Sequence, residues 1–201
     1  MHRAGHPPDA RHLGRDVRGR RAGRADRVDT YAHSDGVTIA YEERGDGEPL
    51  LFIHGLAYDR HGWGPLPDLL AADFRVVLVD NRGVGASDAP EGPYSVRMLA
   101  ADAVAVLDDA GIESAHVFGV SLGGFIAQEI ALTHPDRVRK LVLGSTSPGG
   151  PDAYPMPARG VEAFRTFQTL EREAGLRLMA ENSLGEHGVR ERPELADEIY
   201  V

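Results

Sequence analysis

The chain has 201 residues, of which 42% are hydrophobic and 24 are glycine, and it contains no cysteine. This length and composition allow one sizeable core, and the absence of cysteine excludes disulfides and thiolate chemistry. The formal net charge of -9 argues against nucleic acid or an anionic membrane as a partner. Because no apolar stretch is long enough for a membrane span or a signal peptide, we expect a cytoplasmic protein.

Residues 1–28 differ in composition from the rest of the chain. They hold eight arginines and three aspartates, and prolines and glycines interrupt any helical pattern. This composition predicts a disordered basic extension. A nucleic-acid-binding arm is the alternative, but no aromatic residue alternates with the arginines to stack on bases.

Regular structure is predicted from Thr30 onwards. Two strands, Thr30–His33 and Val37–Glu43, flank the tight-turn sequence Ser34–Gly36. The apolar run Pro49–Ile53 predicts a strand that is covered on both faces, and Arg75–Val79 predicts another buried strand, with a short helix between them.

The following elements alternate between helix and strand. Ser95–Ala110 has apolar residues on one helical face, with Asp102 and two other aspartates elsewhere. A strand over Val117–Val120 precedes a helix that begins at Leu122, and Val138–Gly144 is the last clear strand. This order predicts an α/β fold with a doubly wound, mostly parallel sheet, and a site at the carboxyl ends of its strands.

Ser121 stands where one of these strands passes directly into a helix. So sharp a turn strains the serine backbone, and Gly119 and Gly123 leave room for neighbouring segments, while Gly124 allows close helix packing. The hydroxyl would face the helix amino terminus, where the N–H of Leu122 can stabilise an oxyanion. An idle serine in a glycine-rich turn is the alternative, but Gly-x-Ser-x-Gly in this context favours a nucleophile.

Two other patterns suggest sites that the sequence does not support. Gly83-x-Gly85 follows a strand, as in a dinucleotide fingerprint, but Pro90 and Pro93 prevent the required helix. We predict instead a structural turn in which Asp80 and Arg82 tie loops together. The set His54, Asp59 and His61 has no recognised metal-ligand spacing, so we expect neither a metal nor a cofactor.

Residues 148–201 change in character. Prolines and glycines form a linker, apolar residues then recur at helical spacing, and Pro193 begins a final predicted helix over Glu194–Val201.

The chain resembles the α/β-hydrolase superfamily. Three motifs agree in order: His54–Gly55, Asp80–Ser87 and Gly119–Gly124. The resemblance implies a hydrolase core over residues 29–147 and the start of a helical cap over 148–201. It also implies a small-molecule substrate, as in the esterases, enol-lactone hydrolases and carbon–carbon bond hydrolases that the sequence resembles most.

By this resemblance Ser121 is the nucleophile. The backbone N–H groups of Leu56 and Leu122 are the oxyanion donors, and Gly55 lets the backbone approach the substrate. His54 braces the loop, although its ring also suggests a general base.

The acid and base that a serine nucleophile requires are missing from the positions that the family uses. After Ser121 the chain has only His134, at the far end of a helix, and His187, in the cap-like region. Asp152 stands where some members have the acid, and a linker aspartate without a role is the alternative. We therefore expect an incomplete sheet, a chain that is a fragment, and little turnover. A non-catalytic ligand-binding module on a degenerate hydrolase scaffold is the other hypothesis.

Overall fold

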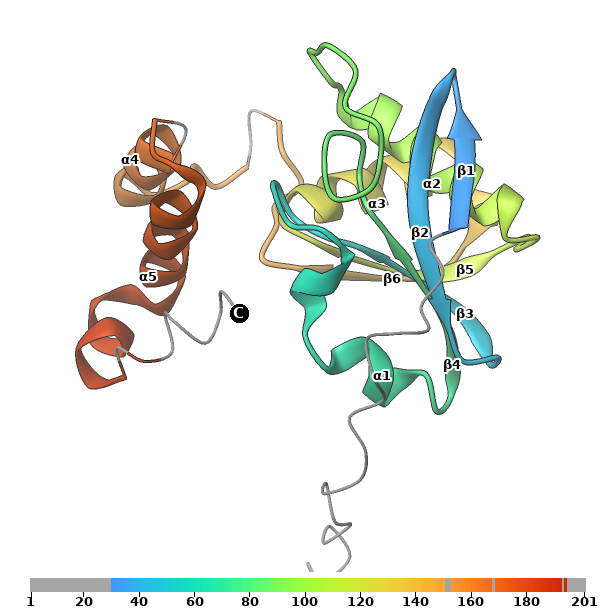
Figure 1. Ribbon diagram of the computed structural model, residues 1–201, viewed down its shortest axis with the longest axis horizontal. Helices are drawn as coiled ribbons and strands as arrows, with labels where there is room; N and C mark the ends of the chain where they lie inside the picture. Colours follow the sequence, from blue (N-terminus) through green and yellow to red (C-terminus); the bar gives the residue numbers. More distant parts are fainter. Residues whose placement is uncertain (1–29, 151–152, 168, 193, 195–201) are drawn as a thin grey trace, which may run out of the picture. The chain divides into compact units, whose positions relative to one another are not determined.

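The computed structural model describes residues 30–150, 153–167, 169–192 and 194, which belong to two compact units that divide after Thr146. The first unit holds a sheet and its covering helices, and the second holds two helices (Figure 1). The disordered extension expected for residues 1–28 and most of the final predicted helix, 195–201, lie outside the described residues.

A six-stranded sheet forms the centre of the first unit, in the order β1-β2-β4-β3-β5-β6. Its strands are β1 (Thr30–Ser34), β2 (Val37–Arg44), β3 (Glu48–Ile53), β4 (Phe74–Val79), β5 (Ala115–Val120) and β6 (Val138–Gly144). β2 is antiparallel to both β1 and β4, whereas the remaining neighbours are parallel. The predicted α/β fold with a mostly parallel sheet is confirmed.

Helices cover both faces of this sheet (Figure 1). The helices α2 (Val96–Asp109) and α3 (Leu122–Thr133) pack on one face, and α1 (Leu66–Leu70) with the 3-10 helix η1 (Arg60–Trp63) covers the other. Residues of β3 alternate between the two cores, with Leu51 on the α2 side and Phe52 on the α1 side. This two-sided burial explains why β3 is apolar from Pro49 to Ile53.

The helix α2 has the amino-terminal cap and the apolar face that its sequence predicts, with one exception. The Ser95 side chain accepts a hydrogen bond from the Met98 N–H at 3.2 Å. Asp102, which the sequence places away from the apolar face, is only 2% exposed. It is buried because the Arg82 guanidinium, from the segment after β4, donates two hydrogen bonds of 2.6 Å to its carboxylate.

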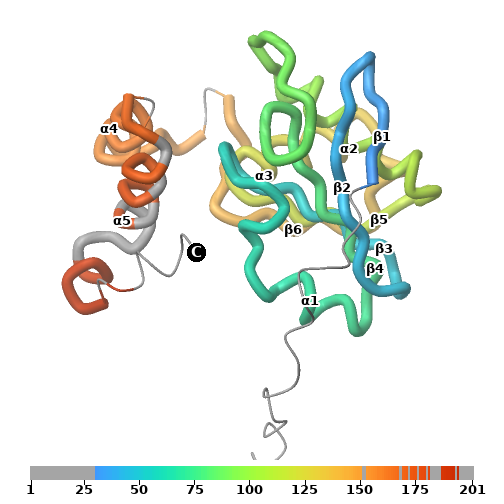
Figure 2. The backbone as a smooth tube through the Cα atoms, in the orientation of Figure 1, coloured from blue at the N-terminus to red at the C-terminus, as the bar shows by residue number. Residues whose placement is uncertain are grey.

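The strand order brings the ends of β3 and β5 together, as the path of the chain shows (Figure 2). Ile53 of β3 pairs with Val79 of β4 on one side and with Gly119 of β5 on the other, and Gly119 in turn pairs with Leu143 of β6. The loops that leave β3 and β5 therefore meet at a topological switch point, where parallel sheets bind ligands.

β6 lies at one edge of the sheet, and no strand of the described residues pairs with its outer side. Leu141, Val142 and Leu143 are 37%, 52% and 43% exposed. An exposed apolar edge strand is a site for pairing with other chains.

Substituting a lysine for Val142 should therefore slow aggregation of the 201-residue chain and change its free energy of unfolding by no more than about 0.5 kcal/mol. Light scattering during incubation measures the first and chemical denaturation the second. Leu69→Lys is the control, because Leu69 is 65% exposed but belongs to α1 rather than to a strand. Equal slowing by both variants would contradict a role for the edge.

The second unit consists of α4 (Ala158–Phe167) and α5 (Arg172–Glu191). Ala163 of α4 is buried, and Leu170 lies in the turn between the helices rather than on either of them. Within the described residues, no helix has the length and apolar character that a membrane crossing requires.

Candidate active site

Ser121 is the single residue between β5 and α3, and its backbone is strained. Its torsion angles are φ 54° and ψ -117°, a region that costs a non-glycine residue about 1–3 kcal/mol. Its N–H donates to the Gly144 carbonyl at 3.0 Å, and its carbonyl accepts from the N–H groups of Gly124 and Phe125. The residue is half-buried and lies at the carboxyl end of β5.

Gly119 and Gly123 lie close to backbone atoms of other residues, and Gly124 lies close to a side chain. A Cβ added at Gly119 would lie 2.2 Å from the Gly123 carbonyl oxygen, and one at Gly123 would lie 1.9 Å from that of Ile53. A Cβ at Gly124 would lie 2.5 Å from the Thr146 side chain. Larger residues would push α3 away from the strands that support it.

The loop after β3 lies directly against Ser121. A Cβ on Gly55 would lie 3.2 Å from the Ser121 Cβ and 3.7 Å from its Oγ. Within the part of the chain that the structure describes, the N–H groups of Leu56 and Leu122 donate no hydrogen bond. Leu56 itself is 45% exposed.

His54 shapes this loop. Its Nδ1 accepts a hydrogen bond from the Gly55 N–H at 2.7 Å, and its ring stacks on Tyr58 with centroids 4.7 Å apart. Burial lowers the pKa of His54, against a smaller opposing effect of its hydrogen bond with the Gly62 backbone. The ring is thus neutral, with its proton on Nε2. No hydrogen bond joins it to Ser121 among the described side chains.

A buried group of charges fixes the next part of the same loop. Arg60 of η1 forms an ion pair with Asp80, Nη1 to Oδ2 at 2.5 Å, and its N–H donates to Oδ1 at 2.7 Å. Arg60 Nε lies 3.8 Å from Glu42 of β2. Burial raises the pKa of Asp80, whereas hydrogen bonds from the Ala86 and Arg60 amides and the Arg60 charge lower it.

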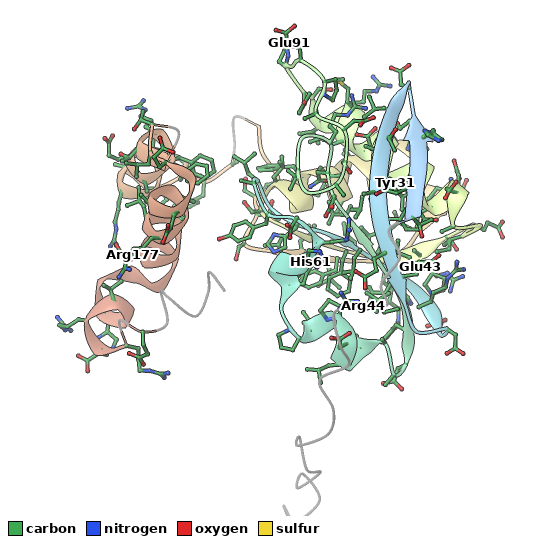
Figure 3. All side chains as sticks on the ribbon, viewed as in Figure 1. Tyr31, Glu43, Arg44, His61, Glu91 and Arg177 are labelled. Atoms are coloured by element: carbon green, nitrogen blue, oxygen red, sulfur yellow. The ribbon has the colours of Figure 1, made fainter. Side chains whose placement is uncertain are left out.

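The charge group continues along β2 to α1. Arg44 extends from β2 on the side of α1 (Figure 3), where it contacts Glu42 at 2.7 Å and Asp68 at 3.1 Å. These ion pairs connect three segments of the chain that are distant in sequence. Asp80 binds Arg60 of η1, and Arg82 binds Asp102 of α2. Both contacts agree with the predicted structural role of Asp80 and Arg82, which was to tie loops to other elements.

The remaining sequence-based candidates do not meet at Ser121. His134 follows α3 at the end opposite Ser121, about 18 Å away along a 12-residue helix. His187 contacts Arg190 in the second unit, and Asp152 lies outside the described residues. Of the histidines and carboxylates that the structure describes, none forms a hydrogen bond with Ser121 Oγ.

Two residues were not identified from the sequence: Thr146, which contacts Ser121, and Arg60, which holds the loop after β3 through Asp80. Thr146 donates its hydroxyl to the Ser121 carbonyl at 2.9 Å. It could have been found, because it closely follows the carboxyl end of β6, as Ser121 follows that of β5. Arg60 could not, because its partner Asp80 is 20 positions away and no local pattern joins them.

Comparisons with known proteins agree with this geometry. A family model for the α/β hydrolase fold matches residues 48–184. RutD of Azorhizobium caulinodans, assigned as a carbamate hydrolase, is 42% identical over 113 residues, covering 56% of this chain and 43% of that protein. A 2-hydroxy-6-oxononadienedioate/2-hydroxy-6-oxononatrienedioate hydrolase of Paraburkholderia phymatum is 37% identical over 163 residues, covering 69% of this chain and 55% of that protein.

A solved structure is similar over a larger part of the chain. Est816, described as an enzyme that degrades N-acyl homoserine lactones, superposes with a TM-score of 0.68 at 32% identity, covering 85% of this chain and 63% of that one. The chain spans about half the length of the curated relatives it matches. The matched family model, the sheet order and the strand–serine–helix turn together establish that this chain belongs to the α/β hydrolase family.

Proposed function

We propose that this chain provides the nucleophile and the oxyanion donors of a serine hydrolase. The observation on which this depends is the half-buried Ser121 at a strained turn, with Gly55 packed against it. Such strain is retained where it serves a function, because relaxed turns are available to a residue that only connects two elements.

In the proposed reaction, Ser121 Oγ attacks the carbonyl carbon of the substrate. The carbonyl oxygen becomes negatively charged and accepts hydrogen bonds from the N–H groups of Leu56 and Leu122, at the amino terminus of α3. The base passes the serine proton to the leaving group as the bond between that group and the acyl carbon breaks, and water then hydrolyses the acyl-enzyme to release the acid and free Ser121. A single oxyanion donor accounts for about a hundredfold to a thousandfold in kcat in such enzymes.

A serine hydroxyl needs a base to take its proton and an acid to orient that base. We propose that both lie outside the described residues, with Asp152 as one candidate for the acid. His54 is not the base in this proposal, because its Nδ1 is occupied by the Gly55 N–H and its Nε2 faces Gly62.

The proposed substrates are small molecules with an ester, a lactone or a related bond next to a carbonyl. This range is taken from the names of the relatives, which describe an enzyme that degrades N-acyl homoserine lactones, a hydrolase of 2-hydroxy-6-oxononadienedioate and a carbamate hydrolase. The proposed chemistry requires no metal or cofactor, since the Ser121 hydroxyl and backbone amides perform the steps described.

A fluorophosphonate probe tests the nucleophile. We expect the protein expressed from its complete gene to be labelled at Ser121, and Ser121→Ala to abolish labelling, with the labelled site read by mass spectrometry. The 201-residue chain should be labelled far more slowly, because its described residues place no base at Ser121. A folded full-length product that is not labelled would refute the proposal.

A non-catalytic ligand-binding module is the second candidate, favoured by the lack of a base beside Ser121 in the described residues. It predicts that the full-length product binds a lactone or ester without turning it over. Calorimetry combined with product analysis separates this outcome from hydrolysis.

A further inference from the structure

We propose that Thr146 is a positioning residue, which fixes the peptide group between Ser121 and Leu122 and so directs the Leu122 N–H. This inference rests on the proposed serine hydrolase function, because that function gives the Leu122 N–H its role as an oxyanion donor.

Thr146 reaches the site by a turn after β6. The strand ends at Gly144, and Ser145 has a φ of 47°, which bends the chain so that Thr146 meets the start of α3. The Thr146 side chain packs against Gly124, where an added Cβ would lie 2.5 Å from both its Cβ and its Cγ2. Its hydroxyl donates to the Ser121 carbonyl at 2.9 Å.

Both peptide groups that flank the strained Ser121 are therefore held by the segment that ends β6. The preceding peptide donates its N–H to Gly144 at 3.0 Å, and the following peptide accepts from Thr146. A peptide group is planar, and its N–H points opposite to its C=O. Holding the Ser121 carbonyl consequently holds the Leu122 N–H, which belongs to the same plane.

The other two bonds to this carbonyl come from α3 itself. Gly124 and Phe125 donate at 2.9 Å and 3.3 Å, so they move with the helix and do not fix its first peptide relative to the sheet. Thr146 links that peptide to β6, and this separates its role from simple filling of the space beside Gly124.

Two substitutions separate positioning from packing. Thr146→Val keeps the branched shape against Gly124 and removes the hydroxyl, whereas Thr146→Ser keeps the hydroxyl and removes the methyl group. Thr133→Val is the matched control, because the Thr133 hydroxyl also donates to a backbone carbonyl of α3, that of Glu129.

The first measurement is the fluorophosphonate labelling of Ser121 in the full-length protein, separated into the maximal rate and the half-saturating probe concentration. We expect Thr146→Val to lower the maximal rate about tenfold with little change in half-saturation, because misdirected oxyanion donors weaken only the transition state. Thr146→Ser should restore the rate, and Thr133→Val should leave it unchanged. A wild-type rate in Thr146→Val would overturn the inference and leave the serine nucleophile in place.

The second measurement does not depend on reactivity. Amide hydrogen exchange of the Ser121 N–H in the 201-residue chain should accelerate about three- to tenfold in Thr146→Val, the effect of one lost hydrogen bond on local opening. Thr133→Val should not change it. If the wild-type protein is never labelled, the proposed function fails, and exchange still decides the role of Thr146, since an unchanged Ser121 N–H would refute it.

Discussion

Alanine in place of Gly123 is expected to destabilise the protein more than any other single methyl group added near the site. Its Cβ would lie 1.9 Å from the Ile53 carbonyl oxygen and 2.8 Å from that of His54. Both contacts are backbone atoms at the end of β3, which cannot rotate away as a flexible side chain would. Overpacking of this kind costs about 3 kcal/mol, of which improved helix propensity recovers up to about 1 kcal/mol.

Chemical denaturation of the two forms measures this difference, and thermal unfolding should show a decrease in Tm of about 4–8 °C. Gly160→Ala is the matched control. Gly160 also lies in a helix, but its added Cβ would meet only the flexible Met156 side chain, at 3.1 Å. That variant should be neutral or slightly stabilised. A Gly123→Ala protein as stable as Gly160→Ala would contradict the close packing of α3 on β3.

The second large effect is expected at Arg60. The Arg60 side chain is 4% exposed and lies between Asp80 and Glu42, whose side chains are 2% and 6% exposed. Replacing it with methionine keeps most of the apolar volume but leaves buried carboxylates without this counter-charge. Removing one partner of a buried ion pair costs about 3–5 kcal/mol.

The loss of unfolding free energy in Arg60→Met should depend on pH. Burial raises the pKa of Asp80, and the Arg60 charge is one of the effects that lower it. Without Arg60 this pKa rises further above its unfolded value, so the folded state loses stability as pH rises through it. The deficit relative to wild type is thus largest at neutral pH and narrows as acid protonates Asp80.

Urea denaturation at neutral and acidic pH measures both the loss of stability and its dependence on pH. Arg60→Met combined with Asp80→Asn should recover part of the loss, because no unpaired charge then remains on that carboxyl group. Arg139→Met is the control, since Arg139 is 39% exposed and 3.6 Å from an exposed Glu48, and its loss should cost no more than about 1 kcal/mol. Equal losses in Arg60→Met and Arg139→Met would show that the buried ion pairs do not stabilise the loop.

The two variants differ in what they reveal about the site. Gly123→Ala alters the packing beneath Ser121. Arg60→Met instead removes the ion pair with Asp80 that holds η1, and η1 belongs to the same loop as Leu56. If the oxyanion donors are used as proposed, both variants should slow labelling of Ser121 in the full-length protein. Only Arg60→Met should do so in a pH-dependent manner.

Local patterns in the sequence were sufficient to predict most elements of the first unit. The hairpin turn at Asp35–Gly36 has positive φ at both residues, as two-residue turns between twisted antiparallel strands require. The alternation of apolar runs and helical periodicity predicted the parallel strands, because burial on both faces leaves only apolar residues over Leu50–Ile53 of β3 and Val76–Val79 of β4. The strand–serine–helix turn is equally local, since its glycines lie within three positions of Ser121.

The partners of these elements were decided only by the tertiary structure. Asp102 follows the helical pattern of a solvent-facing residue, yet Arg82 from another segment buries it. Arg60 and Thr146 reach their partners across 20 and 25 positions, so no local pattern joins either residue to its partner.

The sequence by itself therefore determined that a serine is presented at a strained turn after a parallel strand, because backbone torsion and hydrophobic periodicity depend on adjacent residues. The tertiary structure decided what surrounds that serine: Gly55 from the loop after β3, Thr146 from the segment after β6, and the neutral ring of His54. These contacts follow from the order and register of the strands, which arise from packing of the whole sheet rather than from any one stretch of residues.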